Sequence, residues 1–182
     1  TDYKNVNQSL INEPDYSFVP ALENSILAKI DISPLRLQDF FDIKVGMNIG
    51  GVKERFLHAE NNNNQYYKFI NGGDNVQRWK ITFPTEKQIR KGQRYVDFNK
   101  TIEKEIWDNK IGTPSIGETN DRFINHKVII RQIDTKLSSV LDFDQYHCDY
   151  NLFTATSVNN NDDELYNLIA LLNSDVYSYY AI

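Results

Sequence analysis

The segment Lys127-Val-Ile-Ile-Arg-Gln-Ile133 is the clearest strand signal in the chain. Its centre is β-branched and the segment is short, which is typical of a strand inside a sheet. On the N-terminal side, residues 66–70 and 78–83 predict further strands, separated by a tight turn over 71–74. On the C-terminal side, residues 144–158 predict one or two more. The centre of the chain therefore indicates a sheet.

The region before this sheet begins with a helical pattern. Residues 21–30 place their apolar side chains on one face, and Ser33-Pro34 ends the helix. Residues 35–45 read as an extended segment that enters a turn at Gly46, and a bend at Gly50-Gly51 precedes residues 52–58. This arrangement predicts a hairpin-like beginning. Residues 61–64 and 112–120 read as loops.

Two further helices are predicted from capping signals. The segment 85–88 matches a capping box, which predicts a helix from Glu86 towards Trp107 that is weakened at Gly92. The acidic segment 159–163 caps a final helix with an apolar stripe, and Ser174 could cap another. The stripe consists of Leu165, Leu168, Ile169 and Leu172. We expect an α/β (α+β) fold, a mixed twisted sheet with peripheral helices, in one domain over residues 1–182.

Charge is unevenly distributed along the chain, which has a net charge of −5. Residues 1–43 hold three basic and seven acidic side chains, and residues 137–182 hold seven acidic and no basic ones. Residues 44–136 hold 17 basic against 11 acidic residues. We therefore expect a polyanion to bind the centre of the chain. The alternative interpretation is a solvated surface on which charge is unevenly distributed.

Several catalytic signatures are missing from the sequence. There is no Pro-Pro for the base-binding loop of an amino-methylating enzyme, and no Glu-x-Lys for a common restriction nuclease. The nearest approximations, Asp42-Ile-Lys44 and Asp134-Thr-Lys136, read as strand-end charge. No Gly-rich phosphate loop and no Gly-x-Ser-x-Gly occur. We therefore predict no catalytic residues and no cofactor in this chain.

The sequence also favours no metal and no membrane. The three histidines are scattered, and the adjacent His147 and Cys148 would point to opposite faces of a strand. No apolar run has the length of a membrane helix, and no signal peptide is evident. A single cysteine suits a reducing compartment, so we expect the cytoplasm. Because the chain begins at Thr1 without Met, we expect it to be a piece of a longer protein.

The positive signals are side chains of the types that read base edges or bind phosphates, many of them in or beside turns. The candidates are Lys44, Asn48, Lys53, Arg55, Asn71, Asn75, Gln77, Arg78, Lys80, Lys87, Arg90, Lys91 and Arg94. Trp79 and Trp107, with nearby tyrosines, are candidates for stacking on bases. The competing interpretation is turn propensity and solvation for the polar residues and packing for the aromatic ones.

Four blocks in order resemble the C-terminal specificity domain of TaqI-like adenine-specific DNA methyltransferases and type IIG restriction-modification enzymes. The first is the segment 42–48 with the later Phe56, although Asp42 stands where the family often has Gly and Val45 where it often has Thr. The others are the turn 71–79, the strand 127–133 and the segment 166–174 that closes on Leu-Asn-Ser, with Tyr179-Tyr180.

This resemblance implies a target recognition domain that binds double-stranded DNA and selects a site. A methyltransferase domain that uses S-adenosylmethionine, and in some members a nuclease domain, would lie upstream. Three alternatives stay open: a specificity subunit of a type I system, a nuclease of unfamiliar type with Asp42, Asp134 or Asp142 and Asp144 as acids, and a protein-interaction module.

Overall fold

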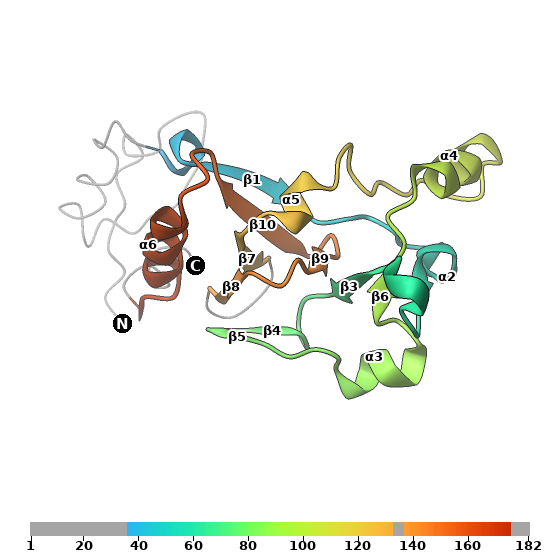
Figure 1. Cartoon of the computed structure of the whole chain (residues 1–182), viewed down its shortest axis with the longest axis horizontal. Coiled ribbons are helices and arrows are strands. Elements are labelled where there is room, and N and C mark those ends of the chain that lie inside the picture. Colours follow the sequence, from blue (N-terminus) through green and yellow to red (C-terminus); the bar gives the residue numbers. More distant parts are fainter. Residues whose placement is uncertain (1–35, 133–136, 176–182) are drawn as a thin grey trace, which may run out of the picture. The chain divides into compact units, whose positions relative to one another are not determined.

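The computed structural model describes residues 36–132 and 137–175 (Figure 1). The chain divides into two units, residues 1–36 and 37–182, and every element named below belongs to the second. Some sequence predictions lie outside the described residues: the helix over 21–30, the Asp134-Thr-Lys136 segment, the helix that would follow Ser174, and Tyr179-Tyr180.

The predicted central strand is an interior strand of the first sheet. This sheet has the order β1-β10-β7-β8, with all neighbours antiparallel. Its strands are β1 (Phe41–Val45), β10 (Leu152–Ser157), β7 (Lys127–Arg131) and β8 (Ser139–Asp142). The predicted interior strand at 127–133 is confirmed over Lys127–Arg131, residue 133 lies outside the described residues, and β8 was not predicted.

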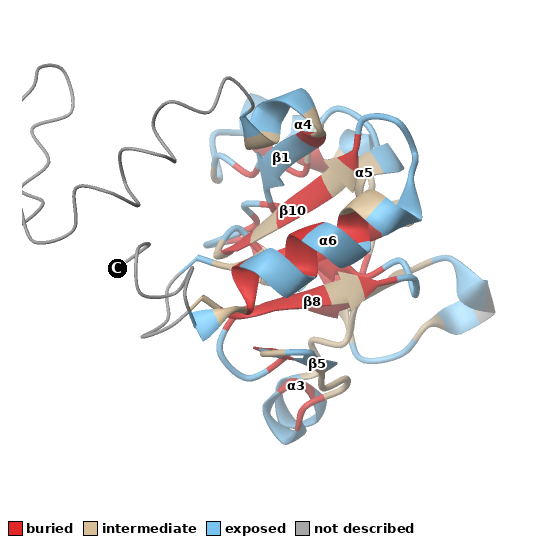
Figure 2. Ribbon diagram, turned by 90° about the vertical axis from the view of Figure 1, so that its left-hand side faces the viewer, coloured by how far each residue is buried: buried red, intermediate tan, exposed pale blue. Residues whose placement is uncertain are grey.

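Helix α6 (Asp162–Leu172) covers one face of this sheet, as predicted from its apolar stripe. Leu165, Leu168, Ile169 and Leu172 are buried against Phe41, Val128 and Ala155. Figure 2 shows α6 lying across the first sheet, with part of its ribbon buried. Asn161 caps the start of the helix: its side chain accepts a hydrogen bond from the Asp163 N–H, and three acidic residues follow in the first turn. The capped, amphipathic helix is thus confirmed.

The other face of the sheet shares a core with a second sheet, in the order β2-β6-β3-β9. Its strands are β2 (Leu57–His58), β6 (Tyr95–Val96), β3 (Tyr67–Ile70) and β9 (His147–Cys148), of which β3 and β9 run parallel. The antiparallel and parallel pairs together confirm a mixed α/β fold, with its strands divided among several sheets.

A small hairpin and a short helix follow the second sheet. The hairpin pairs β4 (Val76–Gln77) with β5 (Lys80–Ile81), and α3 (Glu86–Lys91) begins with the predicted capping box at Thr85. A single helix from Glu86 to Trp107 was wrong. Gly92 ends α3 in the left-handed conformation (φ 63°), β6 intervenes, and Asn99 caps α4 (Lys100–Asp108).

The hairpin-like beginning was also wrong. A 3-10 helix, η2 (Leu37–Asp39), precedes β1, and β1 pairs with β10 far along the chain. Residues 52–58 form α2 (Lys53–Phe56) and the short β2. The segment 61–64, predicted as a loop, contains η3 (Asn62–Asn64), and α5 (Asp121–Ile124) was not predicted.

A glycine explains the path of the chain after β1. A Cβ at Gly46 would lie 2.2 Å from the carbonyl oxygen of Asp149, so only glycine permits this approach. This approach allows the next residue, Met47, to form an isolated parallel β-bridge with Asp149. None of the described helices has the length and apolarity needed to cross a membrane.

Candidate nucleic-acid interface

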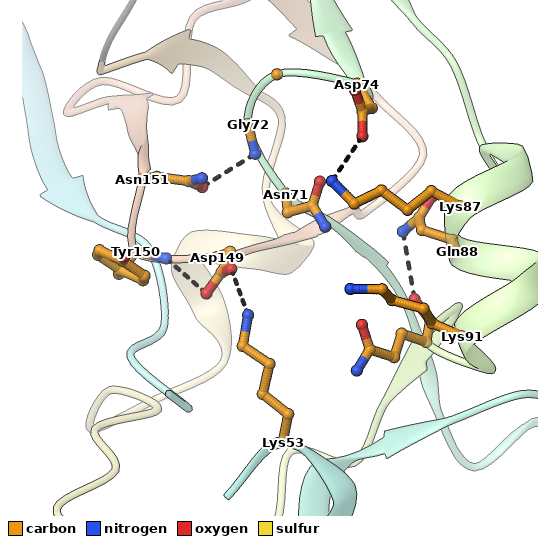
Figure 3. Close-up of a pocket in the computed structure, with 12 residues that line it drawn as sticks. Lys53, Asn71, Gly72, Asp74, Lys87, Gln88, Lys91, Asp149, Tyr150 and Asn151 are labelled. Atoms are coloured by element: carbon orange, nitrogen blue, oxygen red, sulfur yellow. Dashed lines mark hydrogen bonds and ion pairs between the residues drawn. The ribbon is translucent and has the colours of Figure 1, made fainter. Parts of the chain in front are cut away.

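A polar hollow of about 380 Å³ gathers several of the predicted residues (Figure 3). Most of its lining comes from three parts of the chain: the turn between β3 and β4, helix α3, and the segment between β9 and β10. Lys53 reaches it from α2, while Lys87 and Lys91 reach it from α3 on the other side (Figure 3). Residues far apart in the sequence therefore form one surface.

The turn 71–74 is joined to the β9–β10 segment by close packing. The Gly72 N–H donates to Oδ1 of Asn151 at 3.0 Å. A Cβ at Gly72 would lie 2.9 Å from Nδ2 of Asn151, so a larger residue there would have to displace this amide. Gly73 follows with a positive φ of 45°, which favours glycine in such a turn.

Lysines and carboxylates pair across the hollow. Nζ of Lys53 lies 3.1 Å from Oδ2 of Asp149, whose side chain is almost fully buried. Nζ of Lys87 lies 3.1 Å from Oδ2 of Asp74 in the turn. Residues 71–94 hold six basic and two acidic residues. The segment therefore carries an excess of positive charge even though Lys87 is paired with Asp74.

Asn75 lies inside the scaffold of this surface. It is fully buried, its Oδ1 accepts from the Asn71 N–H, and its Nδ2 donates to the Thr82 carbonyl and to Oε1 of Gln88. Gln88 in turn donates to the carbonyl of Phe69. A buried amide with its polar atoms bonded in this way holds the turn, the hairpin and α3 together, and it does not face a ligand.

The hairpin β4–β5 extends from the same turn. Gln77 and Lys80 are an exposed cross-strand pair, while Val76 opposite Ile81 faces the core. The Arg78 guanidinium donates to the Leu137 carbonyl at 3.4 Å and to Asp175 at 3.1 Å. These contacts brace the tip of the hairpin, so base reading by Arg78 would require the Asp175 contact to open.

The remaining candidates occupy other positions. Lys44 pairs with Asp42 on β1, and Arg55 pairs with Glu105 of α4. The Asn48 side chain accepts from the Gly50 N–H. Arg90 is exposed on α3, but Arg94 lies beyond the end of this helix, with its guanidinium over the ring of Tyr95. Lys44, Asn48 and Arg55 do not line the hollow.

Eight of the residues that line the hollow were not among the predicted residues: Gly72, Gly73, Asp74, Gln88, Gln93, Asp149, Tyr150 and Asn151. The last three follow β9 and reach the turn 71–74 only because β9 pairs with β3. No local pattern marks them, since the sequence does not contain the strand pairing that places them.

The residues considered for catalysis or metal binding are engaged elsewhere. Asp142 and Lys127 form an ion pair of 2.5 Å with fully buried side chains. Burial lowers the pKa of His147 to about 3, and its ring stacks between Tyr67 and Phe123. Burial raises the pKa of the Cys148 thiol to about 12. Among the described residues, no group of three or more His, Cys, Asp or Glu side chains could hold a metal ion.

Comparison with protein families identifies the domain to which most of the chain belongs. The family model of the TaqI-like C-terminal specificity domain matches residues 65–182, which include the turn 71–74, the hairpin, α3 and the β9–β10 segment. No curated protein matches the chain. The matched range is well over half of the sequence and contains most of the hollow, and the chain therefore belongs to the family of TaqI-like C-terminal specificity domains.

Proposed function

We propose that this chain is the target recognition domain of a restriction-modification enzyme that methylates adenine in double-stranded DNA. Family membership supports a role in DNA specificity. In this proposal residues 1–182 are one recognition domain, and bond making belongs to other domains of a longer protein. Those domains would supply the methyltransferase with its S-adenosylmethionine and, in a type IIG enzyme, a nuclease. Such an enzyme would act in the cytoplasm.

One structural observation carries the proposal: the positively charged segment 71–94 is folded so that cations and polar turns share one surface. Asn75 and Gln88 fix this surface from inside through hydrogen bonds to the turn, the hairpin and β3. A rigid support is what sequence reading requires, because a base contact discriminates only if its donor is held in place.

The proposed division of work follows the position of each side chain. Arg90 and Lys91 are exposed on α3, and with Lys53 and Lys87 they would contact phosphates, which give affinity without sequence information. Gln77 and Lys80 on the hairpin, and Asn71 in the turn, would contact base edges. Apart from Lys53 on α2, both sets lie within residues 71–91, and one duplex would have to contact the hairpin and α3 together.

A selection experiment tests this function. The chain is incubated with short duplexes that carry a randomised core, bound duplexes are recovered at rising salt, and the enriched sequences are read. We expect one short motif to be enriched, and a Gln77→Ala variant to relax one or two positions of it. Enrichment of no motif, together with equal binding to all duplexes, would contradict a recognition role.

A further inference from the structure

Trp79 is a large apolar side chain at the tip of the β4–β5 hairpin, and 59% of its surface is exposed. Its backbone has a φ of 65°, in the left-handed region that a bulky residue seldom adopts. Both the exposure of an indole and the backbone conformation cost free energy in the isolated chain. A partner that covers the indole would offset both of these costs.

The tip is held firmly despite its backbone conformation. The Trp79 N–H donates to the carbonyl of Ser139 in β8 at 3.1 Å. Ser139 is itself fixed by Asn173: the Ser139 N–H and hydroxyl both donate to Oδ1 of Asn173 at 3.0 Å, and Nδ2 of Asn173 donates to the Ser139 carbonyl at 2.9 Å. Both Ser139 and Asn173 are buried. The indole is thus presented from a fixed backbone.

The neighbours of the indole indicate its partner. Gln77 and Lys80 flank the tip as an exposed pair, and Arg78 adjoins it. The exposed amide of Gln77 and ammonium of Lys80 suit base edges and phosphates, whereas the guanidinium of Arg78 is engaged with Leu137 and Asp175. An indole beside them suits a base step that it partly opens, because the base faces of an intact duplex are covered by their neighbours and become available for stacking only where the step is unstacked.

We propose that Trp79 packs its indole against a nucleobase of the bound DNA, with Ser139 and Asn173 as the residues that position it. This inference rests on the proposed function and adds a specific contact to it. The indole would fill the space beside a base, while Gln77 and Lys80 contact polar edges nearby. Because stacking tolerates different bases, Trp79 would contribute mainly to affinity. It would also fix the position of the hairpin along the duplex.

The chain offers a direct test, because Trp79 and Trp107 are its two tryptophans. Trp107 is exposed on α4 and serves as the matched control. Two single-tryptophan chains are prepared, Trp107→Phe and Trp79→Phe, and are titrated with a fluorescently labelled duplex enriched by selection. Anisotropy of the label reports binding, and tryptophan emission reports the surroundings of each indole.

We expect the emission of Trp79 in the Trp107→Phe chain to fall by about half or more on binding, since stacking on bases quenches an indole. The emission of Trp107 in the Trp79→Phe chain should stay unchanged. Trp79→Ala should weaken binding by about 5-fold or more, the lower end of base–aromatic stacking because opening a base step offsets part of the gain, and Trp107→Ala should not.

Two outcomes would overturn the inference. If the duplex binds while Trp79 emission and the affinity of Trp79→Ala are both unchanged, Trp79 does not touch DNA and the recognition function stands without it; a protein partner would then be the occupant of the tip. If wild-type chain binds no duplex even at low salt, the proposed function fails and this contact fails with it.

Discussion

The ion pair between Lys127 and Asp142 is buried in the first sheet, so removal of one partner alone should destabilise the protein. Neither side chain has any exposed surface, and Lys127 also donates to the Phe123 carbonyl. Asp142 accepts from the N–H groups of Asp144 at 2.8 Å and Tyr146 at 2.9 Å. The pair therefore joins β7 to β8 and fixes the turn that follows β8.

Lys127→Met keeps most of the apolar stem but leaves the Asp142 carboxylate buried without a cation. Breaking a buried pair by removing one partner costs about 3–5 kcal/mol. At roughly 2–4 °C per kcal/mol for a protein of this size, the melting temperature should fall by about 6–20 °C. Adding Asp142→Asn removes the stranded charge, so the double variant should lose less than the sum of the two single losses, with a coupling of about 1–3 kcal/mol.

The assay is urea unfolding followed by circular dichroism for the four proteins of this cycle. The matched control is the cycle of Lys44→Met and Asp42→Asn. Lys44 and Asp42 also form a lysine–aspartate ion pair, but their side chains on β1 are about half exposed. This control cycle should yield a coupling of no more than about 1 kcal/mol. A Lys127→Met variant that loses less than 1 kcal/mol, or a cycle without coupling, would refute the reasoning.

Three further experiments test other parts of the fold. Gly46→Ala should cost about 2–4 kcal/mol because its Cβ would collide with the Asp149 carbonyl, whereas Gly73→Ala, in open space with positive φ, should cost only about 1–2 kcal/mol; equal unfolding midpoints in urea would contradict this. His147 has a pKa of about 3 in the folded chain, below its ordinary 6.5, so the unfolded chain takes up its proton first and stability is lost as pH falls from about 6.5 towards 3. His147→Gln should flatten that slope by up to about 1.4 kcal/mol per pH unit, and identical pH profiles of unfolding would count against it. Leu168→Asp should unfold the chain because it buries an unpaired charge, whereas Leu171→Asp, on the exposed side of α6, should leave the melting temperature near that of wild type. If Leu171→Asp were the more destabilising variant, Leu171 and not Leu168 would be the buried residue.

Local patterns predicted the elements whose burial is decided locally. The β-branched run of β7 and the stripe of α6 each carry their own signal, so the strand and the helix are found where expected. The pairing of β1 with β10 has no such signal: Phe41 meets Ser157 because the core and the close approach at Gly46 select that partner. The predicted hairpin failed for this reason.

The error over 86–107 has a different cause. The capping box fixed the start of α3 correctly, and Gly92 was treated as a weak point within one helix. In the structure Gly92 adopts the left-handed conformation that ends a helix, and Tyr95 and Val96 join the second sheet. Tertiary pairing of two residues outweighed the helical propensity of the segment.

In the candidate site, too, the sequence indicated the types of the residues, but their burial and contacts depend on strands that are distant in the sequence. Asn71 and Asn75 occupy one turn and look alike in sequence, but Asn71 lines the hollow and Asn75 is buried beneath it. Lys127 was recognisable as part of a strand, yet its burial depends on Asp142 in a neighbouring strand. Tyr150 and Asn151 reach the hollow only through the parallel pairing of β9 with β3.

The salt dependence of DNA affinity tests the central claim most directly. Affinity for a selected duplex is measured across a range of salt for wild type, for Arg90→Ala with Lys91→Ala, and for Lys104→Ala with Lys110→Ala as an equally charged control on and beside α4. We predict that the α3 variant lowers the slope of log affinity against log salt by about 1–2 and weakens all duplexes alike, while the control keeps the wild-type slope. An α3 variant with an unchanged slope, or a control that loses as much as it does, would contradict a DNA interface at α3 and the hollow.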